Sequence, residues 1–260
     1  MTIQEMKQLM QERGYTYAQI ADLSGVPLGT VQKIFNGETK SLRYDILTAL
    51  ERIFKEPMAV MESCAAYGEE KKPGMYTIED YRALPEEQRV ELIDGYFYDM
   101  AAPTTFHQLM AGEVYRQIAN YIIDQEGACT PFISPIDVQL DNDEKTMIQP
   151  DVIIVCKPDQ IVRRNIMGAP DFVLEVISPG TKRRDHVVKL FKYEQAGVRE
   201  YWIVDPYKKR VLVYFFQREA SPVIYPIDAD IPVNIYEGKL TIKFQQIAKW
   251  AEKEDSDRIC

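Results

Sequence analysis

An apolar run, FVLEVI at residues 172–177, carries a carboxylate at Glu175 and is bounded by turn-forming residues at both ends. Such a run predicts a strand. An ionised carboxylate is almost never buried unless it is paired or bound to a metal ion, because removing it from water is costly. The chain must therefore fold so that Glu175 meets a partner or serves as a working group.

The 260 residues exceed the roughly 150 of a typical domain, so we expect one large domain or two unequal ones. The longest apolar runs, such as 152–156, are far shorter than the roughly 18 residues that span a bilayer, and the N-terminus lacks a signal-peptide pattern. We expect a cytoplasmic protein without membrane contact. Cys64, Cys129, Cys156 and Cys260 lack metal-ligand spacing, so we expect free thiols.

The net charge of −9 argues against a protein that coats nucleic acid non-specifically, since that affinity comes from neutralising phosphates. Residues 1–66 hold 7 Lys+Arg and 8 Asp+Glu, a net charge of −1. Residues 75–260 hold 22 and 30, a net charge of −8. A local basic groove stays compatible with this balance.

The first 66 residues predict a helix-turn-helix, because two short helical patterns at 16–24 and 28–37 flank a tight turn. Thr16 suits a helix N-cap, and Gly25 suits the positive φ of the turn. Small, turn and core residues fall in register, and the segment resembles the phage-repressor (Xre/Cro) helix-turn-helix family over most of its length.

That resemblance implies that the second helix of the pair lies in a DNA major groove, with Leu28, Gly29 and Lys33 facing bases. The residues expected to touch phosphates are Thr16, Gln32, Asn36, Lys40 and Arg43. Leu28 and Gly29 offer no side-chain hydrogen bonds for base discrimination. The alternative is therefore a helical docking or dimerisation module that has lost base readout.

A polar segment at 67–74 contains Gly and Pro and lacks apolar periodicity, so we assign it as a linker between a helix-turn-helix domain at 1–66 and a second domain at 75–260. The second domain mixes helical and strand patterns. Helices are predicted at 77–83, 86–91, 107–124 and 184–196, strands at 132–140, 151–156, 171–178, 200–204 and 210–216, and a hairpin turn at 94–95. This order predicts an α/β fold with helices on a mixed sheet.

Two carboxylates belong to successive predicted strands. Asp151 follows Pro150 at the mouth of one strand, and Glu175 lies in the next, so they can converge at one edge of the sheet if the strands are neighbours. Such a pair suits Mg²⁺, with Mn²⁺ as the alternative ion, because Mg²⁺ keeps several waters and commonly takes one or two protein carboxylates. A metal held this way activates water and offsets charge on a phosphoryl group, which favours phosphodiester hydrolysis.

The order helix, strand, Pro-Asp strand, Glu strand, helix, strand resembles the PD-(D/E)xK nuclease superfamily. Three blocks, at 170–179, 185–189 and 196–206, resemble the Uma family of restriction endonucleases, within a resemblance that covers about residues 75–245. It implies a restriction-endonuclease-like mixed sheet flanked by helices. It also implies that Asp151 and Glu175 bind the metal, aided by the backbone carbonyl of Val176.

The superfamily places a lysine two residues after the glutamate, where this chain has Ile177. The Uma-type pattern implies that Lys189 supplies the cation instead, with Lys182 as a weaker substitute. Four side chains of the predicted helix share one face by i+3 and i+4 spacing: Asp185, Lys189, Lys192 and Tyr193.

The same resemblance places His107 and Glu91 near the site. His107 is a candidate for hydrogen bonding to phosphate or for proton transfer, and a helix-start polar role is the alternative. The alternative for Glu91 is a structural role. The alternative for Glu175 is a buried ion pair with Lys189. His186 lies off the face of Asp185 and Lys189, so we expect it to be solvated.

These patterns predict a Mg²⁺-dependent DNA endonuclease that a helix-turn-helix delivers to DNA, and a homodimer if it cuts both strands. Lys189 is expected to orient the attacking water. The alternative is a DNA-binding regulator or interaction protein that keeps the nuclease fold as a catalytically silent scaffold. Ile177 and the charge of residues 75–260 favour that alternative.

Overall fold

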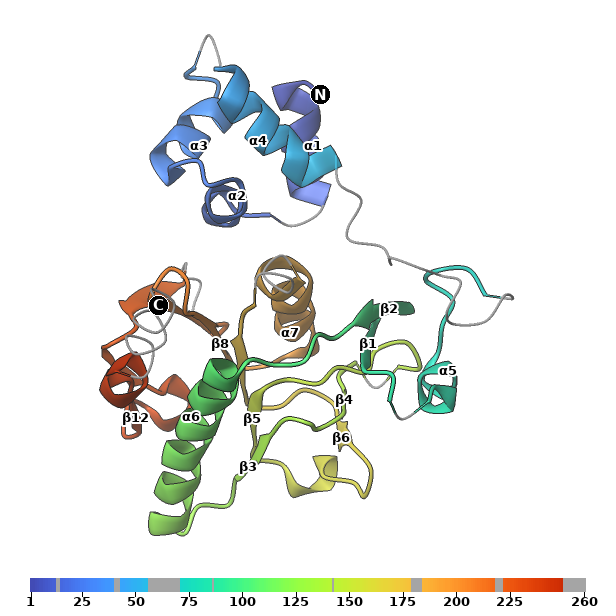
Figure 1. Ribbon diagram of the computed structural model, residues 1–260, viewed down its shortest axis with the longest axis vertical. Helices are drawn as coiled ribbons and strands as arrows, with labels where there is room; N and C mark the ends of the chain where they lie inside the picture. Colours follow the sequence, from blue (N-terminus) through green and yellow to red (C-terminus); the bar gives the residue numbers. More distant parts are fainter. Residues whose placement is uncertain are drawn as a thin grey trace, which may run out of the picture.

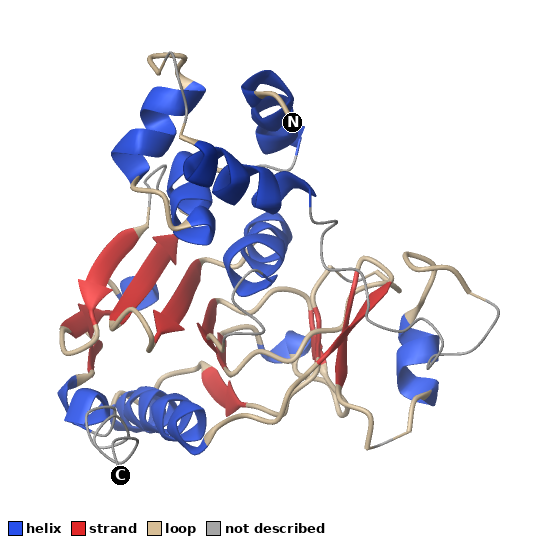
Figure 2. Ribbon diagram, turned by 45° about the horizontal axis from the view of Figure 1, so that its top comes forward, coloured by secondary structure: helices blue, strands red, loops and turns tan. Residues whose placement is uncertain are grey.

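The computed structural model describes residues 1–12, 15–39, 43–55, 71–85, 87–141, 143–178, 184–217 and 222–249. The N-terminal part is helical, and the larger part is a mixed sheet covered by helices (Figures 1 and 2). The helical elements are α1 (Ile3–Glu12), α2 (Tyr17–Ser24), α3 (Leu28–Phe35), α4 (Tyr44–Lys55), α5 (Ile78–Ala83), α6 (Thr105–Asp124), η2 (Pro158–Gln160), η3 (Arg184–Lys189), α7 (Leu190–Ala196) and η4 (Asn234–Tyr236). The strands are β1 (Val90–Ile93), β2 (Tyr96–Asp99), β3 (Thr130–Ile133), β4 (Val138–Gln139), β5 (Val152–Val155), β6 (Ile166–Met167), β7 (Phe172–Val176), β8 (Glu200–Asp205), β9 (Arg210–Phe215), β10 (Val223–Pro226), β11 (Asp230–Pro232) and β12 (Thr241–Lys243).

The helix-turn-helix begins and turns at the residues that the sequence indicates. The Thr16 side chain accepts a hydrogen bond from the backbone N–H of Gln19, and the Gln19 side chain accepts one from the backbone N–H of Thr16, which together cap α2. Gly25 ends α2 with a φ of 73°. Val31 and Ile34 of α3 are buried in the domain core.

The main sheet has the strand order β10-β9-β8-β7-β5-β3, with β7 and β8 parallel and the other neighbours antiparallel. Side chains of one face pack against α6, and those of the other face pack against α7 (Figure 1). Because both faces are covered, β5, β7 and β8 are buried along their whole length. The predicted fold class is confirmed.

Two predicted elements differ from the structure. The helix expected at 86–91 is wrong, because the described residues 87–89 form a turn and irregular backbone, and Val90 and Glu91 belong to β1, which pairs with β2 across the Asp94-Gly95 turn. Asp94 and Gly95 both have positive φ, as the predicted tight hairpin requires. The strand expected at 132–140 is divided into β3 and β4, since Pro135 has no amide hydrogen with which to continue a ladder.

The expectation of four free thiols is wrong for one pair, because Cys129 and Cys156 form a disulfide. Thr130 pairs with Val155 in the antiparallel register of β3 and β5, so the next position brings the two cysteines opposite each other. The pairing depends on a register that spacing along the chain does not reveal. Cys64 and Cys260 lie outside the described residues.

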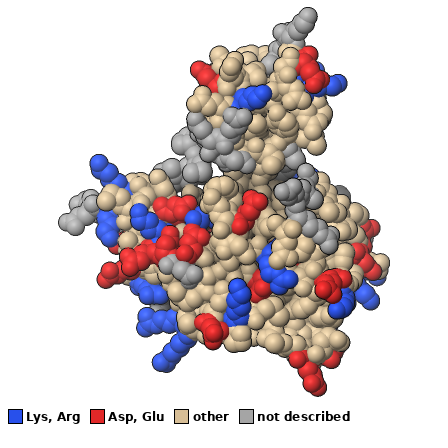
Figure 3. Space-filling model, turned by 180° about the vertical axis from the view of Figure 1, so that it is seen from behind, with Lys and Arg blue, Asp and Glu red and all other residues tan. Residues whose placement is uncertain are grey.

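No helix in the described part of the chain is both long and apolar enough to cross a bilayer. Figure 3 shows one face of the molecule. Among the described residues on that face, acidic and basic side chains are interspersed. The linker predicted at 67–74 is described only from residue 71 onward.

Candidate active site

Glu175 lies on the α7 side of the sheet. Its neighbours Leu174 and Val176 point the other way and pack with the α6 cluster. Glu175 is 4% exposed, and its Oε1 lies 2.8 Å from Lys189 Nζ and accepts a hydrogen bond of 2.7 Å from the Tyr193 hydroxyl. The carboxylate in the apolar run is therefore buried with a cation and a hydroxyl donor.

Lys189 ends the π-helical segment η3, and its ammonium contacts a group of acidic side chains. Its Nζ lies 2.7 Å from Glu91 Oε1 and 3.7 Å from Asp185 Oδ1, in addition to its contact with Glu175. The backbone N–H of Gln149 also donates to Glu91 Oε1, at 3.0 Å. The structure thus brings Lys189, Glu91 and Glu175 together from three separate elements.

Asp151 precedes β5, and continuing the register of β5 and β7 places it opposite Glu175. Its Oδ2 accepts a 2.7 Å hydrogen bond from the backbone N–H of Val176 and lies 3.1 Å from Nε2 of His107. His107 stands in the first turn of α6, where the Thr104 side chain accepts from its backbone N–H. All five residues predicted for the catalytic centre therefore lie in two adjoining contact groups.

Burial and the neighbouring acidic side chains shift the pKa values of Glu175 and His107. Burial raises the pKa of Glu175 well above its ordinary value; the charge of Lys189 opposes this rise, and Asp151, Asp185 and Glu91 add to it. Burial alone would lower the pKa of His107, but its hydrogen bond to Asp151 and the charges of Asp151 and Asp185 outweigh burial and raise it.

The centre carries more acidic than basic side chains. Its four carboxylates, those of Glu91, Asp151, Glu175 and Asp185, face one lysine and one histidine. A further cation beside these carboxylates would favour their ionised forms and oppose the rise in the pKa of Glu175.

The carboxylates of the centre fit Mg²⁺ as part of its ligand set. Among the described residues, no group of three or more His, Cys, Asp or Glu side chains is arranged to hold a metal ion by itself. Asp151 and Glu175 nevertheless offer two carboxylates on facing strand ends, and Mg²⁺ commonly takes one or two protein carboxylates and fills its remaining positions with water or substrate oxygens.

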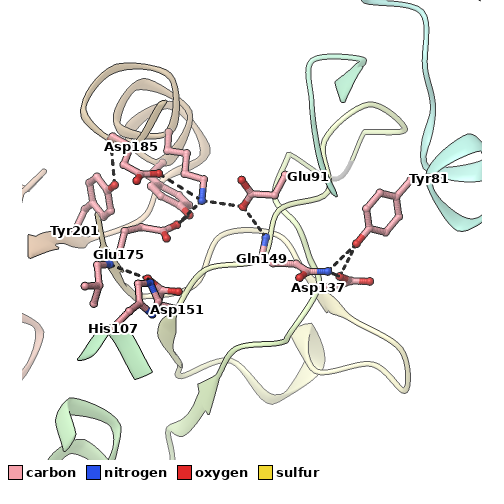
Figure 4. A network of polar contacts seen from close by, with 12 residues as sticks. Tyr81, Glu91, His107, Asp137, Gln149, Asp151, Glu175, Asp185 and Tyr201 are labelled. Carbon is pink, nitrogen blue, oxygen red and sulfur yellow. Dashed lines mark hydrogen bonds and ion pairs between the residues drawn. The ribbon is translucent and has the colours of Figure 1, made fainter. Parts of the chain in front are cut away.

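A second group of side chains, which the sequence did not indicate, extends from this centre (Figure 4). The side-chain amide of Gln149 donates to the Tyr81 hydroxyl and to Asp137 Oδ1, both at 2.9 Å, and the Tyr81 hydroxyl donates to Asp137 Oδ1. Gln149 also contacts Glu91 through its backbone. The one signal in the sequence is that Gln149 directly precedes the Pro-Asp pair.

Three lysine and histidine predictions have different outcomes. Lys192 shares the spacing of Lys189 but pairs with Asp94 and Asp141 rather than with the acidic centre. His186 is 1% exposed, so its predicted solvation is wrong; η3 is packed between the sheet and the helix-turn-helix domain. Lys182 lies outside the described residues.

The predicted DNA-facing residues lie on the surface of the helix-turn-helix domain. Leu28 is 42% exposed, and the others that the structure describes are exposed as well: Thr16, Gly29, Gln32, Lys33, Asn36 and Arg43. The Asn36 side chain accepts a hydrogen bond from the Tyr17 hydroxyl, which ties α3 to α2. Lys40 lies outside the described residues.

Comparison with family models agrees with this architecture. The model of Uma2, described as "Putative restriction endonuclease", matches residues 78–231, which is more than half of the chain. The chain belongs to the Uma2 family. A second model, of a helix-turn-helix, matches residues 6–60, so this Uma2 member carries an additional N-terminal helix-turn-helix domain.

A solved structure shows the same fold. The crystal structure of a "putative nuclease belonging to DUF820" from Anabaena variabilis ATCC 29413 superposes with a TM-score of 0.56 and 21% sequence identity. The match covers 67% of this chain and 98% of that one. No protein of curated function matches the chain. The Uma2 fold is therefore shared with a solved relative, while its chemistry must be argued from the site.

Proposed function

We propose that the chain is a Mg²⁺-dependent endonuclease that hydrolyses phosphodiester bonds in DNA and is directed to it by the N-terminal helix-turn-helix. One observation carries the proposal. Lys189 lies in η3, the element after the strand that carries Glu175, and its Nζ is 2.8 Å from Glu175 Oε1. The position at which the superfamily has its lysine is occupied by Ile177. The chain thus regains, from η3, the pairing of acid and lysine that the PD-(D/E)xK pattern requires.

In this proposal Asp151, Glu175 and the backbone carbonyl of Val176 hold the metal, with Mn²⁺ able to replace Mg²⁺. When bound, the ion lowers the pKa of a coordinated water and offsets negative charge on the phosphoryl group. Lys189 orients the attacking water and stabilises developing charge from a position fixed by Glu91 and Glu175. His107, hydrogen bonded to Asp151, is placed to donate to a phosphate oxygen.

The two strands of the proposed DNA substrate argue for a second copy of the chain. One centre cuts one strand, so a double-strand break requires two centres, and we infer a homodimer for that product. Because DNA is the proposed substrate, we also infer a cytoplasmic location.

A specific observation favours a second candidate, a DNA-binding regulator with a silent nuclease fold. Lys189 is only 3% exposed and is engaged by two carboxylates, as in a structural ion pair. In that case the acidic centre stabilises the fold without turnover.

Plasmid nicking in Mg²⁺ or Mn²⁺ separates the two candidates. We expect the wild-type protein to convert supercoiled plasmid to the nicked form, and Asp151→Ala, Glu175→Ala and Lys189→Ala to lose this activity while keeping their circular dichroism spectra. Absence of nicking by a folded wild-type protein on several DNA forms, with no metal bound in calorimetry, would leave the regulator as the function.

A further inference from the structure

The segment that carries Lys189 is held from two sides. On the sheet side, the Tyr201 hydroxyl donates to the backbone carbonyl of Asp185 at 3.0 Å. On the other side, the side-chain amide of Gln19, in α2 of the helix-turn-helix, donates to the backbone carbonyl of His186 at 3.2 Å. Consecutive carbonyls of η3 are thus bound by a strand of one domain and a helix of the other.

Apolar packing joins the same two parts. Val187 is 7% exposed, and it packs with the core of the helix-turn-helix rather than with either face of the sheet. One of the two residues between the carbonyl contacts and Lys189 therefore belongs to the core of the N-terminal domain, whereas the other, Val188, packs with the sheet. π-helical turns are rare and frequently lie at functional sites, and this one is held by contacts from both sides.

Gln19 uses the two ends of its side-chain amide for different contacts. Its Oε1 accepts from the backbone N–H of Thr16 at 2.7 Å in the helix cap, while its Nε2 reaches His186. Thr16 is exposed at the N-terminus of α2, where it is predicted to touch a DNA phosphate. One side chain thus connects a predicted DNA contact to the backbone three residues before Lys189.

We propose that Gln19 is a positioning residue for Lys189, so that the docked helix-turn-helix forms part of the support of the nuclease centre and DNA bound at α2 stabilises the η3 segment. This rests on the proposed nuclease function for its catalytic consequence. The domain contact itself can be tested without activity.

Gln19→Glu isolates the contact. Glutamate keeps the acceptor that caps α2, but it replaces the donor facing the His186 carbonyl with an acceptor. Gln19→Met, of similar length, removes both contacts. Gln4→Glu makes the same chemical change on the exposed surface of α1, away from the predicted DNA contacts, and serves as the control.

Hydrogen exchange of the full chain, in EDTA, measures the segment directly. We expect amides of residues 187–193 to exchange about tenfold faster in Gln19→Glu and Gln19→Met, and at the wild-type rate in Gln4→Glu. A short duplex of random sequence should slow this exchange in the wild type and not in Gln19→Glu. Equal exchange in wild type and Gln19→Glu would show that the contact does not hold η3, and would overturn the proposal.

Nicking under saturating plasmid gives the catalytic readout. We expect Gln19→Glu to lower kcat about tenfold with little change in KM, whereas Gln4→Glu should leave both kcat and KM unchanged. A wild-type kcat in Gln19→Glu would overturn the positioning role. If the wild-type protein does not cut DNA, the proposed function fails, and hydrogen exchange still decides whether Gln19 holds the segment.

Discussion

Lys189 is the residue that links the carboxylates of the acidic centre. Its ammonium lies within 2.8 Å of two carboxylates from different strands, and it is 3% exposed. These contacts fix the position of its ammonium between β1 and β7. Its neighbour Lys192, three residues along, is bound to a different pair of acids and provides a natural comparison.

We predict that Lys189→Met lowers the rate of plasmid nicking on the order of a hundredfold or more, because the transition state loses its charged donor. Lys192→Met, the same change three residues later in α7, should keep most of the activity. Single-turnover nicking with matched folded fractions measures both. Equal activity losses in the two variants would mean that the segment was disrupted and that Lys189 has no special role.

At the scale of elements, Lys192 joins α7 to the β1–β2 hairpin through Asp94 and to the segment after β4 through Asp141. Burial lowers the pKa of Lys192, but its hydrogen bonds to Asp141 and Asp94 outweigh burial and raise it above 10.5. Asp94 is largely exposed, so solvent screens that half of the interaction.

We expect Lys192→Met to lower the free energy of unfolding by about 1–2 kcal/mol at neutral pH. Because the pKa of Lys192 is raised in the folded state, its stabilisation is complete below pH 10.5 and is lost as the pH rises through the folded value. The difference between variant and wild type should therefore be constant near neutrality and shrink in strong alkali. Urea unfolding at several pH values measures it, and a difference that already shrinks near neutrality would assign it to another group.

Glu200 links β8 to η4 in a similar way. It is fully buried and accepts from Trp202 Nε1, Asn234 Nδ2 and the backbone N–H of Ile235, at 2.7, 2.8 and 2.8 Å. We predict that Glu200→Gln costs about 2–3 kcal/mol, because the new amide turns a donor toward a donor. Thermal unfolding should show this loss, whereas Glu194→Gln, on the exposed face of α7, should change stability by less than about 0.5 kcal/mol.

Local patterns predicted much of the fold. The capped α2, the turn at Gly25 and the hairpin at Asp94-Gly95 depend on neighbouring residues, and each is present. The disulfide and the Gln149 group depend on strand register and on the docking of the hairpin, which no spacing along the chain records. The sequence predicted which residues form the site. It did not show that Glu91 and Glu175 contact the same lysine, because that depends on how β1, β7 and η3 pack in the folded chain.

At the scale of the whole molecule, DNA contact is expected at the helix-turn-helix. We predict that Lys33→Ala and Arg43→Ala each weaken DNA binding and reduce the slope of log affinity against log salt by about 1, since each removes a phosphate or groove contact. Lys239→Ala, an exposed lysine of the second domain, is the control. Fluorescence anisotropy across a salt series measures the slopes, and unchanged slopes would exclude this face from DNA binding.

The packing of Val187 inside the N-terminal core also sets a limit on protein engineering. Another helix-turn-helix of the same fold cannot be grafted onto residues 75–260 by matching the linker alone. A working chimaera must also provide a cavity for Val187 and an amide at the position of Gln19. Exchanging the N-terminal domain therefore also requires contacts that match η3, which lies far along the chain from the linker.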